Sequence, residues 1–269
     1  GTYKELLTGP VGALYRKVLA RYVQLARAAG VNQAMYPEGG LSLTGALQPP
    51  KMGLLSYVVE GFDPESERDV VLMPVAINYD RVLEDKVLIA ADQRGDRRFG
   101  ARITVVVGFI LRKLWQRLTR QETRFGTAAV AFGAPLSLRE AGGDATVEAL
   151  SDELMARISG AMPVLSVPLI STVLLEGQAL ETQALLDRAA QVLGQVPLAN
   201  RAVDASELET ELRQALNGLR ARGVVLCDQS IWRANPEEVA VLRFYANSIA
   251  HLLPENAAPA LDVSATARS

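Results

Sequence analysis

The spacing of hydrophobic residues divides the first half of the chain into alternating helices and strands. Apolar side chains recur at helical spacing over residues 13–29, with Arg and Lys between them, and Gly30 is placed to end that helix. Strands are then expected at 32–36, 70–79 and 127–133, with a helix at 51–61 and a turn at 134–138. The strand at 70–79 is almost wholly apolar and is expected to be buried. This alternation is typical of an α/β sheet with parallel strands.

After Gly142 the pattern changes to one of helices alone. These helices are expected at residues 145–161, 174–193, 205–222 and 236–253. Asp204 or Ser206 is placed to cap the third of them, and Pro236 lies in the first turn of the fourth. The predicted fold is an α/β domain at 1–139 followed by a helical C-terminal domain at 140–269. Its tail, from about residue 254, is expected to be disordered.

Composition narrows the class of protein. With 269 residues, 49% of them hydrophobic, the chain can bury a substantial core. The single cysteine, Cys227, excludes an internal disulfide, and one cysteine with one histidine makes a zinc site unlikely on composition. We therefore expect neither a metal nor a resident cofactor. No apolar stretch reaches the roughly 18 residues that span a bilayer, so a soluble or peripheral protein is expected.

Charge is distributed unevenly along the chain. Residues 1–139 carry 19 basic and 13 acidic side chains, whereas residues 140–269 carry 9 and 17. Such a dipolar chain is typical of a protein with one face toward an anionic surface or partner, although two ordinary domains can also differ this much by chance.

The most basic segment also contains many apolar residues. Nine basic residues lie within 94–124, and apolar side chains alternate with them around Arg112, Lys113, Trp115 and Arg117. On a helix this pattern is typical of an interfacial element on an anionic membrane, and it also suits an acidic acyl-carrier protein. A solvated helix face is the alternative. Nucleic acid is disfavoured, because the C-terminal half is acidic and no recognised motif is present.

The decapeptide Tyr36–Gly45 carries the most chemical information. Its glycines, Gly39 and Gly40, let the backbone approach a ligand and turn its N–H groups toward it. Possible ligand-binding side chains in and just after this loop are Glu38, Ser42, Thr44 and Lys51. A carboxylate for hydroxyl groups and a lysine with amides for phosphate suit a polyol phosphate. A Gly/Pro-rich turn without a ligand remains the alternative.

Other residues have two interpretations each. The apolar segment 163–175 is either a buried core element or the lining of an acyl-chain pocket. Pro74 is expected at an edge or a bulge of its strand, because it cannot donate to a ladder. His251 lies three residues after Ser248, but no oxyanion site is evident, so a structural histidine is expected.

Four segments, in order, resemble the glycerolipid acyltransferases. They are LYRKVLARYV, YPEGGLSLTGALQPPKMGLL, VVLMPVAINYDRVLED and FYANSIAHLL. The second is similar to the Phe-Pro-Glu-Gly block of that family, and its extension through Pro-Pro-Lys-x-Gly resembles the glycerol-3-phosphate acyltransferase branch. This resemblance implies an acyltransferase-type α/β domain and places Pro74 beside the active site.

The resemblance implies transfer of an acyl group from acyl-CoA or acyl-carrier protein to the sn-1 hydroxyl of glycerol 3-phosphate. This step belongs to phospholipid biosynthesis, and we expect a peripheral protein on the cytoplasmic side of the inner membrane. The family's base is the histidine of a His-x-x-x-x-Asp motif, which this sequence does not contain. We therefore expect the chain to begin inside a longer protein and to show no turnover by itself.

Two residues differ from the family pattern, so the resemblance does not fix which molecule accepts the acyl group. Leu41 and Leu43 stand where the family often has arginines, which are the favoured bidentate partners of phosphate. A lysophosphatidate acyltransferase is one alternative function. A non-catalytic module that binds lipid or a carrier protein is another.

Overall fold

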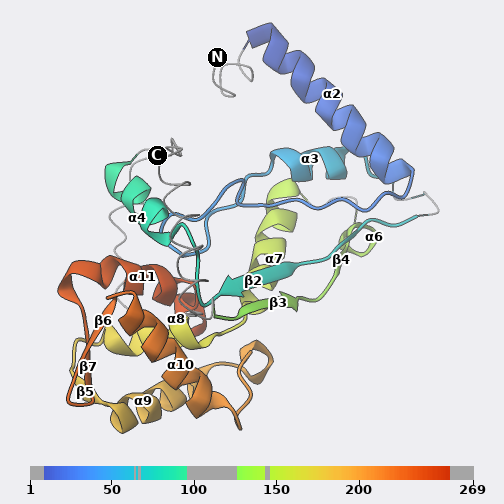
Figure 1. Ribbon diagram of the computed structural model, residues 1–269. Helices are drawn as coiled ribbons and strands as arrows, with labels where there is room; N and C mark the ends of the chain where they lie inside the picture. Colours follow the sequence, from blue (N-terminus) through green and yellow to red (C-terminus); the bar gives the residue numbers. More distant parts are fainter. Residues whose placement is uncertain (1–8, 64, 66–67, 96–125, 143–145, 255–269) are drawn as a thin grey trace, which may run out of the picture. The chain divides into compact units, whose positions relative to one another are not determined.

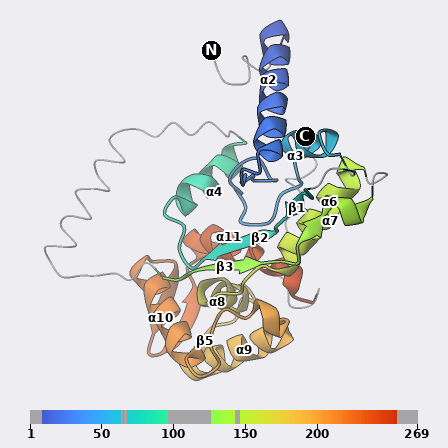
Figure 2. The same ribbon diagram turned by 90° about the vertical axis from the view of Figure 1, so that its right-hand side faces the viewer.

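The computed structural model describes residues 9–63, 65, 68–95, 126–142 and 146–254, and it is a mixed α/β structure with small sheets (Figures 1 and 2). Two compact units interleave along the chain. Unit 1 comprises residues 1–41, 48–76 and 132–161, and unit 2 comprises 42–47, 77–131 and 162–269. The predicted division into folding domains at residues 139 and 140 stays a prediction.

Among the described residues, unit 1 contains three helices of eight residues or more, one four-residue helix and one short strand pair. The longer helices are α2 (Gly9–Ala28), α3 (Gly53–Glu60) and α7 (Val147–Gly160). These confirm the helices predicted at 13–29, 51–61 and 145–161. Their shared core consists of Val23, Val58, Leu136, Leu138 and Leu150. The start of α7 is fixed by the hydroxyl of Thr146, which accepts a hydrogen bond from the backbone N–H of Ala149 at 3.2 Å.

The strand predicted at 70–79 is interrupted at its proline. The strands of this region are β1 (Val71–Leu72), β2 (Val75–Tyr79), β3 (Ala128–Phe132) and β4 (Leu136–Ser137). Pro74 is buried between β1 and β2, and its carbonyl accepts from the N–H of Gly133 at 2.9 Å. β3 confirms the strand predicted at 127–133, whereas the single strand predicted at 70–79 is divided at Pro74 into two strands of different sheets. The turn predicted at 134–138 is wrong, since β4 pairs with β1 there and α6 (Leu138–Ala141) follows.

The prediction of parallel strands is also wrong. β1 pairs with β4 in antiparallel register, and β2 pairs with β3. At opposite ends of the second pair, Gly133 N–H donates to the Pro74 carbonyl and Asp80 N–H to that of Thr127, so it too is antiparallel. Residues 32–36, the expected first strand, form no strand. Without that strand the described residues contain no βαβ unit, and each of these two pairs forms between strands distant in sequence.

β2 is buried on one face only, whereas the sequence predicted a buried strand. Ala76 and Asn78 are buried, while Val75, Ile77 and Tyr79 remain 38%, 42% and 43% exposed. The alternation follows the two-residue period of a strand whose second face has no cover from the described residues. Asn78 satisfies its buried amide by donating to the carbonyl of Pro163 at 2.9 Å and to the hydroxyl of Ser248 at 3.2 Å.

Unit 2 is built around one fully buried helix. Its helices are α4 (Asp85–Arg94), α8 (Ser166–Leu174), α9 (Thr182–Gln195), α10 (Leu208–Ala221) and α11 (Val239–Asn247). Every residue of α8 is buried, and α9, α10 and α11 all pack against it. The structure therefore supports the prediction that residues 163–175 form a buried core element. Within the described parts of the chain, no helix is both long and apolar enough to cross a bilayer.

The helix predicted at 174–193 is wrong, and the C-terminal region is not wholly helical. Gly177, at φ +86°, ends the turn after α8, and β5 (Leu180–Glu181) precedes α9. β6 (Val225–Asp228) and β7 (Ile231–Ala234) form a hairpin on which β5 pairs. Its turn residues, Gln229 and Ser230, both have positive φ although neither is the Gly or Asn that signals such a turn in a sequence.

The other two predicted C-terminal helices are shorter than expected. α10 begins at Leu208, three residues after the predicted start, and Asp204 accepts from Ser206 ahead of the helix without capping it. The predicted helix at 236–253 divides into a 3₁₀ turn (Pro236–Glu238), α11 and a second 3₁₀ turn (Ala250–Leu252).

The first turn of α10 carries Glu209 and Glu211, whose charge opposes contact with nucleic-acid phosphates. The absence of a nucleic-acid partner stays a prediction.

A buried polar network joins three elements of unit 2. Asp85, at the start of α4, forms an ion pair with Arg222 and accepts from the Tyr245 hydroxyl at 2.7 Å. That hydroxyl in turn accepts from the N–H of Val82 at 3.0 Å. Burial, together with the neighbouring Asp85 carboxylate, raises the pKa of Tyr245 to about 12, so the phenol stays protonated at neutral pH.

Replacing Asp85 by Asn should destabilise the chain by about 2–3 kcal/mol, because the Arg222 guanidinium loses its countercharge inside the protein. The Arg222 side chain is only 17% exposed, so water compensates little. Urea unfolding measures the change. The control is Lys86→Met, which removes the exposed Lys86–Glu238 pair and should cost less than about 1 kcal/mol. Equal effects would contradict the role of the buried network.

Candidate functional site

The first half of the predicted ligand loop is a tight turn in unit 1. Gly39 N–H donates to the carbonyl of Tyr36 at 2.9 Å, and Gly39 has a φ of +64°. The end of the loop returns to its start, because Lys51 N–H donates to the carbonyl of Pro37 at 2.7 Å. These bonds hold Tyr36–Gly39 and Lys51 together across the 11 intervening positions, 40–50, which form no helix or strand.

Lys51 lies directly against Gly39. A Cβ added at Gly39 would be 2.7 Å from the lysine Cδ and 3.3 Å from its Nζ. A Cβ added at Gly40 would meet nothing within 4 Å, and in the described part of the chain no hydrogen bond uses its N–H. The ammonium group, which is in no ion pair among the described residues, lies against Gly39, and the N–H of the next residue, Gly40, is available to a ligand. This is the combination that binds phosphate.

Glu38 brings a carboxylate to the same turn. Its Oε2 accepts from the N–H of Gln48 at 3.2 Å. Burial raises the pKa of Glu38 more than this hydrogen bond lowers it. The structure therefore brings together Glu38, Gly39, Gly40 and Lys51, which we call the Glu38–Lys51 cluster. It presents a carboxylate that can accept from hydroxyl groups and a cation with an open amide that can bind an anion.

The second half of the loop belongs to unit 2, and its hydroxyls serve the loop itself. Ser42 Oγ donates to the carbonyl of Ala46 at 2.7 Å, and Thr44 Oγ1 accepts from the N–H of Ala46 at 3.4 Å. Asn247 of α11 donates to the Thr44 carbonyl at 2.9 Å. These bonds shape the loop, and the binding of a ligand by Ser42 and Thr44 stays a prediction.

The two leucines of the loop have different environments. Leu43 is 8% exposed and belongs to the core of unit 2, whereas Leu41 is 61% exposed. A side chain at position 43 therefore points into the core, away from any ligand in solution. Close packing also fixes Gly45, where a Cβ would be 1.8 Å from the Phe244 carbonyl oxygen. Of the two positions at which the family often has arginine, only position 41 is exposed, so only Leu41 can affect recognition of a ligand at the surface.

Asp80, which sequence reasoning did not single out, is, besides Asp85, a second buried carboxylate of the resembled fourth block. Its two oxygens accept from the N–H groups of Val167 at 2.8 Å and Thr127 at 3.0 Å. Val167 lies in the first turn of α8, where the helix dipole favours an anion. Even so, burial raises the pKa of Asp80. The sequence motif Tyr79-Asp80-Arg81 could have drawn attention to Asp80. It does not reveal that Asp80 accepts a hydrogen bond from Val167, 87 residues later.

The remaining predicted site residues cannot be assigned a ligand. Pro74 occupies the break between β1 and β2, and its place in a binding site stays a prediction. The predicted membrane- or carrier-facing residues lie outside the described residues: Arg112, Lys113, Trp115 and Arg117.

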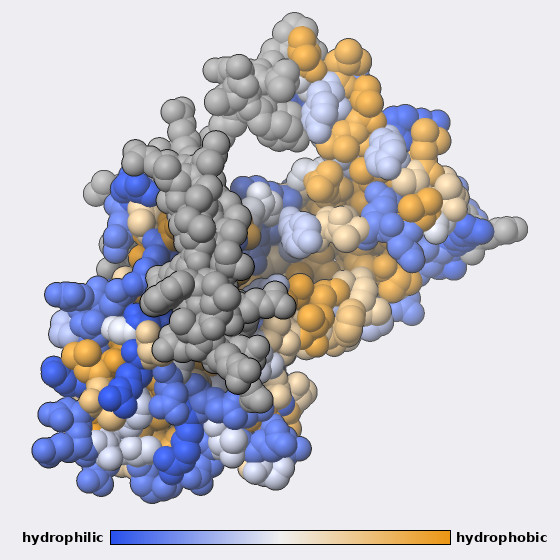
Figure 3. Space-filling view, in the orientation of Figure 1, coloured by the Kyte–Doolittle hydropathy of each residue, from blue (hydrophilic) through white to orange (hydrophobic). Residues whose placement is uncertain are grey.

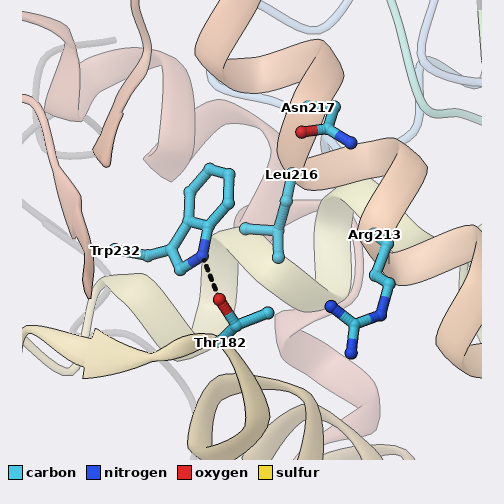
Figure 4. A pocket seen from close by; sticks show the side chains of 5 residues that line it. All are labelled: Thr182, Arg213, Leu216, Asn217 and Trp232. Atoms are coloured by element: carbon cyan, nitrogen blue, oxygen red, sulfur yellow. Dashed lines mark hydrogen bonds between the residues drawn. The ribbon is translucent and has the colours of Figure 1, made fainter. Parts of the chain in front are cut away.

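A pocket of about 130 Å³ lies in unit 2, between α10, the start of α9 and β7 (Figure 4). Its lining residues are Thr182, Arg213, Leu216, Asn217 and Trp232. Trp232 Nε1 donates to the Thr182 hydroxyl at 2.9 Å, and Arg213 is paired with Glu209. Ligand pockets usually have volumes of about 300–1,000 Å³, so this one is too small for an acyl chain.

Comparison with known proteins identifies a family. A family model described as the glycerol-3-phosphate acyltransferase C-terminal region matches residues 111–268. The chain is 31% identical to the glycerol-3-phosphate acyltransferase of Aeromonas hydrophila subsp. hydrophila over 266 residues, which cover 89% of this chain and 32% of that protein. It is 29% identical to the Shewanella amazonensis protein of the same name, with coverage of 89% and 32%.

A mycobacterial relative is similar over slightly more of the chain. The protein named as acyltransferase plsB1 in Mycobacterium tuberculosis is 28% identical over 278 residues, which cover 95% of this chain and 42% of that protein. The chain thus spans about a third to two-fifths of the length of these curated relatives.

A methyl group at Gly39 should displace Lys51 from the turn, because it would overlap the lysine side chain and would also strain a backbone at positive φ. We expect Gly39→Ala to weaken binding of inorganic phosphate, as a probe of the anion site, at least about tenfold, as a lost charge-assisted contact does. Titration calorimetry measures the affinity. Gly53→Ala, at the start of α3 and outside the cluster, is the matched control, because an added Cβ there meets nothing within 4 Å; it should bind nearly normally, and equal losses in both variants would contradict the packing of Lys51 on Gly39.

The raised pKa of Glu38 predicts a pH dependence of stability. The folded chain holds this proton more tightly than the unfolded chain, whose value is near the ordinary 4.5, so the free energy of unfolding should decline as the pH rises above that value. Glu38→Gln has no proton to lose and should lack this part of the decline. Urea unfolding of both proteins over a pH series gives the difference, and parallel curves would contradict the prediction.

Proposed function

The chain belongs to the glycerol-3-phosphate acyltransferase family, and from this premise we propose that its polypeptide acylates the sn-1 hydroxyl of glycerol 3-phosphate. Because the chain spans less than half of the curated relatives, this activity is proposed for a polypeptide that also carries the family's histidine motif. The residues described here would supply the acceptor site.

The Glu38–Lys51 cluster carries the proposal. Glycerol 3-phosphate has a phosphate at one end and hydroxyl groups at the other two carbons. The Lys51 ammonium and the open amide of Gly40 suit the phosphate, while the Glu38 carboxylate can accept a hydrogen bond from a hydroxyl. Held at both ends, the acceptor would present one hydroxyl in a fixed orientation.

The chemical step requires a base that this sequence does not contain. In the proposed reaction the sn-1 oxygen attacks the thioester carbonyl, a new ester bond forms and the carbon–sulfur bond breaks. The hydroxyl proton passes to the base and then to the leaving thiolate. The only histidine, His251, is followed five positions later by Asn256, so it does not provide the motif. The acyl donor is acyl-CoA or acyl-carrier protein, and no resident metal or cofactor is needed.

Lysophosphatidate is the second candidate acceptor. The exposed Leu41 favours it, because an apolar side chain next to the cluster can contact an acyl chain and an arginine at that position would bind phosphate instead. In either case the product is an amphiphile. We propose that the protein works as a peripheral protein at the cytoplasmic side of the inner membrane, on an anionic surface.

An assay of acyl transfer decides between the acceptors. A polypeptide extended upstream to include a histidine motif is tested with glycerol 3-phosphate and with lysophosphatidate, next to its Glu38→Gln variant. Activity on glycerol 3-phosphate that falls in the variant supports the proposal. Activity on lysophosphatidate alone supports the second candidate. No activity on either, with the motif intact, would support a non-catalytic lipid- or carrier-binding module.

The chain by itself allows a binding test. Lys51→Met should weaken glycerol 3-phosphate binding at least about tenfold, since a cation that contacts phosphate contributes about 1.5–3 kcal/mol. Lys86→Met is the control, because Lys86 lies on α4 and pairs with Glu238. Equal affinity of the Lys51→Met and unmodified chains, measured by calorimetry, would place the phosphate elsewhere.

A further inference from the structure

Helix α2 of unit 1 has a continuous apolar face that no described residue covers. The apolar residues of this face are three or four positions apart in the sequence, so they lie on one side of the helix. They are Val11, Leu14, Val18, Tyr22 and Leu25, with exposed fractions of 63%, 64%, 60%, 68% and 53%. We call them the α2 stripe. Figure 3 shows hydrophobic side chains along α2.

The opposite face of α2 attaches the helix to unit 1. Val23 is buried in the core with Val58 of α3, and Arg27 donates a hydrogen bond to the carbonyl of Gly61. The Gln33 side chain donates to the carbonyl of Val23 at 3.2 Å. The helix is thus fixed to the unit by one face, and the α2 stripe lies outside that contact.

The charges of α2 are all of one sign. The helix carries Arg16, Lys17, Arg21 and Arg27, and it contains neither Asp nor Glu. Lys17 and Arg21 are exposed, and each lies three residues after a member of the stripe, so they flank it on the same side. An apolar face bordered by cations is typical of a helix that lies in the interface of an anionic bilayer.

We propose that the α2 stripe inserts among the acyl chains of an anionic phospholipid surface while Lys17 and Arg21 contact its headgroups. This rests on the proposed function, which it deepens by naming a surface for the membrane. A second copy of the chain fits the stripe less well, because pairing two such helices would bring like charges together. A bilayer supplies both the apolar phase and the negative charge that the helix lacks.

Co-sedimentation with vesicles tests the proposal on the whole chain. One set is phosphatidylcholine alone, and the other contains an equal part of phosphatidylglycerol. The chain should bind the anionic vesicles, and salt should weaken the binding. A triple variant, Leu14→Gln, Val18→Gln and Tyr22→Gln, should bind at least tenfold more weakly. Replacing Lys17 and Arg21 by Gln should cost about fivefold for each cation, on the anionic vesicles only.

Matched controls keep the outcome decisive. Leu83, Leu198 and Ile231 of unit 2 are exposed apolar residues, and their replacement by Gln should leave vesicle binding unchanged. Tyr22→Trp keeps the aromatic character of the stripe, and its fluorescence should shift to shorter wavelengths on anionic vesicles, which tests the insertion even if the triple variant folds poorly.

Three results would overturn the proposal: no binding to anionic vesicles, undiminished binding by a folded triple variant, or a concentration-dependent dimer that the triple variant abolishes. The last would make the stripe a protein interface. Calorimetry with glycerol 3-phosphate separates this proposal from the acceptor site. The triple variant should keep its affinity for that ligand, whereas Lys51→Met should keep its binding to vesicles.

Discussion

The complete burial of α8 is the constraint on which unit 2 depends. A helix that exposes none of its nine residues must be covered on every side, and α9, α10 and α11 provide that cover. Of its polar side chains, Ser166 and Thr172 have hydrogen-bond partners inside the protein, whereas the buried Ser171 hydroxyl has none among the described residues. Thr172 donates to the Pro168 carbonyl at 3.0 Å, and the Asp80 carboxylate accepts from the first turn of the helix. The position of α8 thereby fixes the end of β2.

Unit 2 also buries the charge of Asp85, and the partners of this carboxylate form a hydrogen-bonded network. Asp85 has both a guanidinium and a phenol as partners, and the phenol also accepts from a backbone amide. Such networks lose stability when one member is removed, although a well-packed apolar replacement of the whole set can be neutral. This network joins α4 to α11, which come from the two segments that resemble the fourth block and the C-terminal motif.

The two parts of the ligand loop have different roles. Residues 42–47 are anchored in unit 2 by Asn247, by the burial of Leu43 and by the close approach of Gly45 to Phe244. The Glu38–Lys51 cluster in unit 1 keeps its amide and its ammonium group available. Within unit 1 the cluster is held by its own bonds, from Gly39 N–H to the Tyr36 carbonyl and from Lys51 N–H to the Pro37 carbonyl, and this preorganisation reduces the entropy lost when a ligand binds.

The sequence by itself determined the features whose causes are local. Helical periodicity predicted α2, α3 and α7 to within a few residues, because the apolar faces of those helices repeat along one segment. The glycines and prolines of the loop indicated a turn, and Gly39 adopts the positive φ of one, whereas the packing of Lys51 against Gly39 was not predicted. The family resemblance likewise rested on contiguous residues, and the family model confirms it.

Only the tertiary structure decided what depends on partners distant in the chain. Strand direction is set by which strand lies alongside, so the antiparallel pairs could not be read from the alternation of elements. The break between α8 and α9 depends on a hairpin about 50 residues later. The burial of Leu43 and the pairing of Asp85 with Tyr245 depend on α11. In each case the deciding energy comes from packing and hydrogen bonds between segments, which no local pattern encodes.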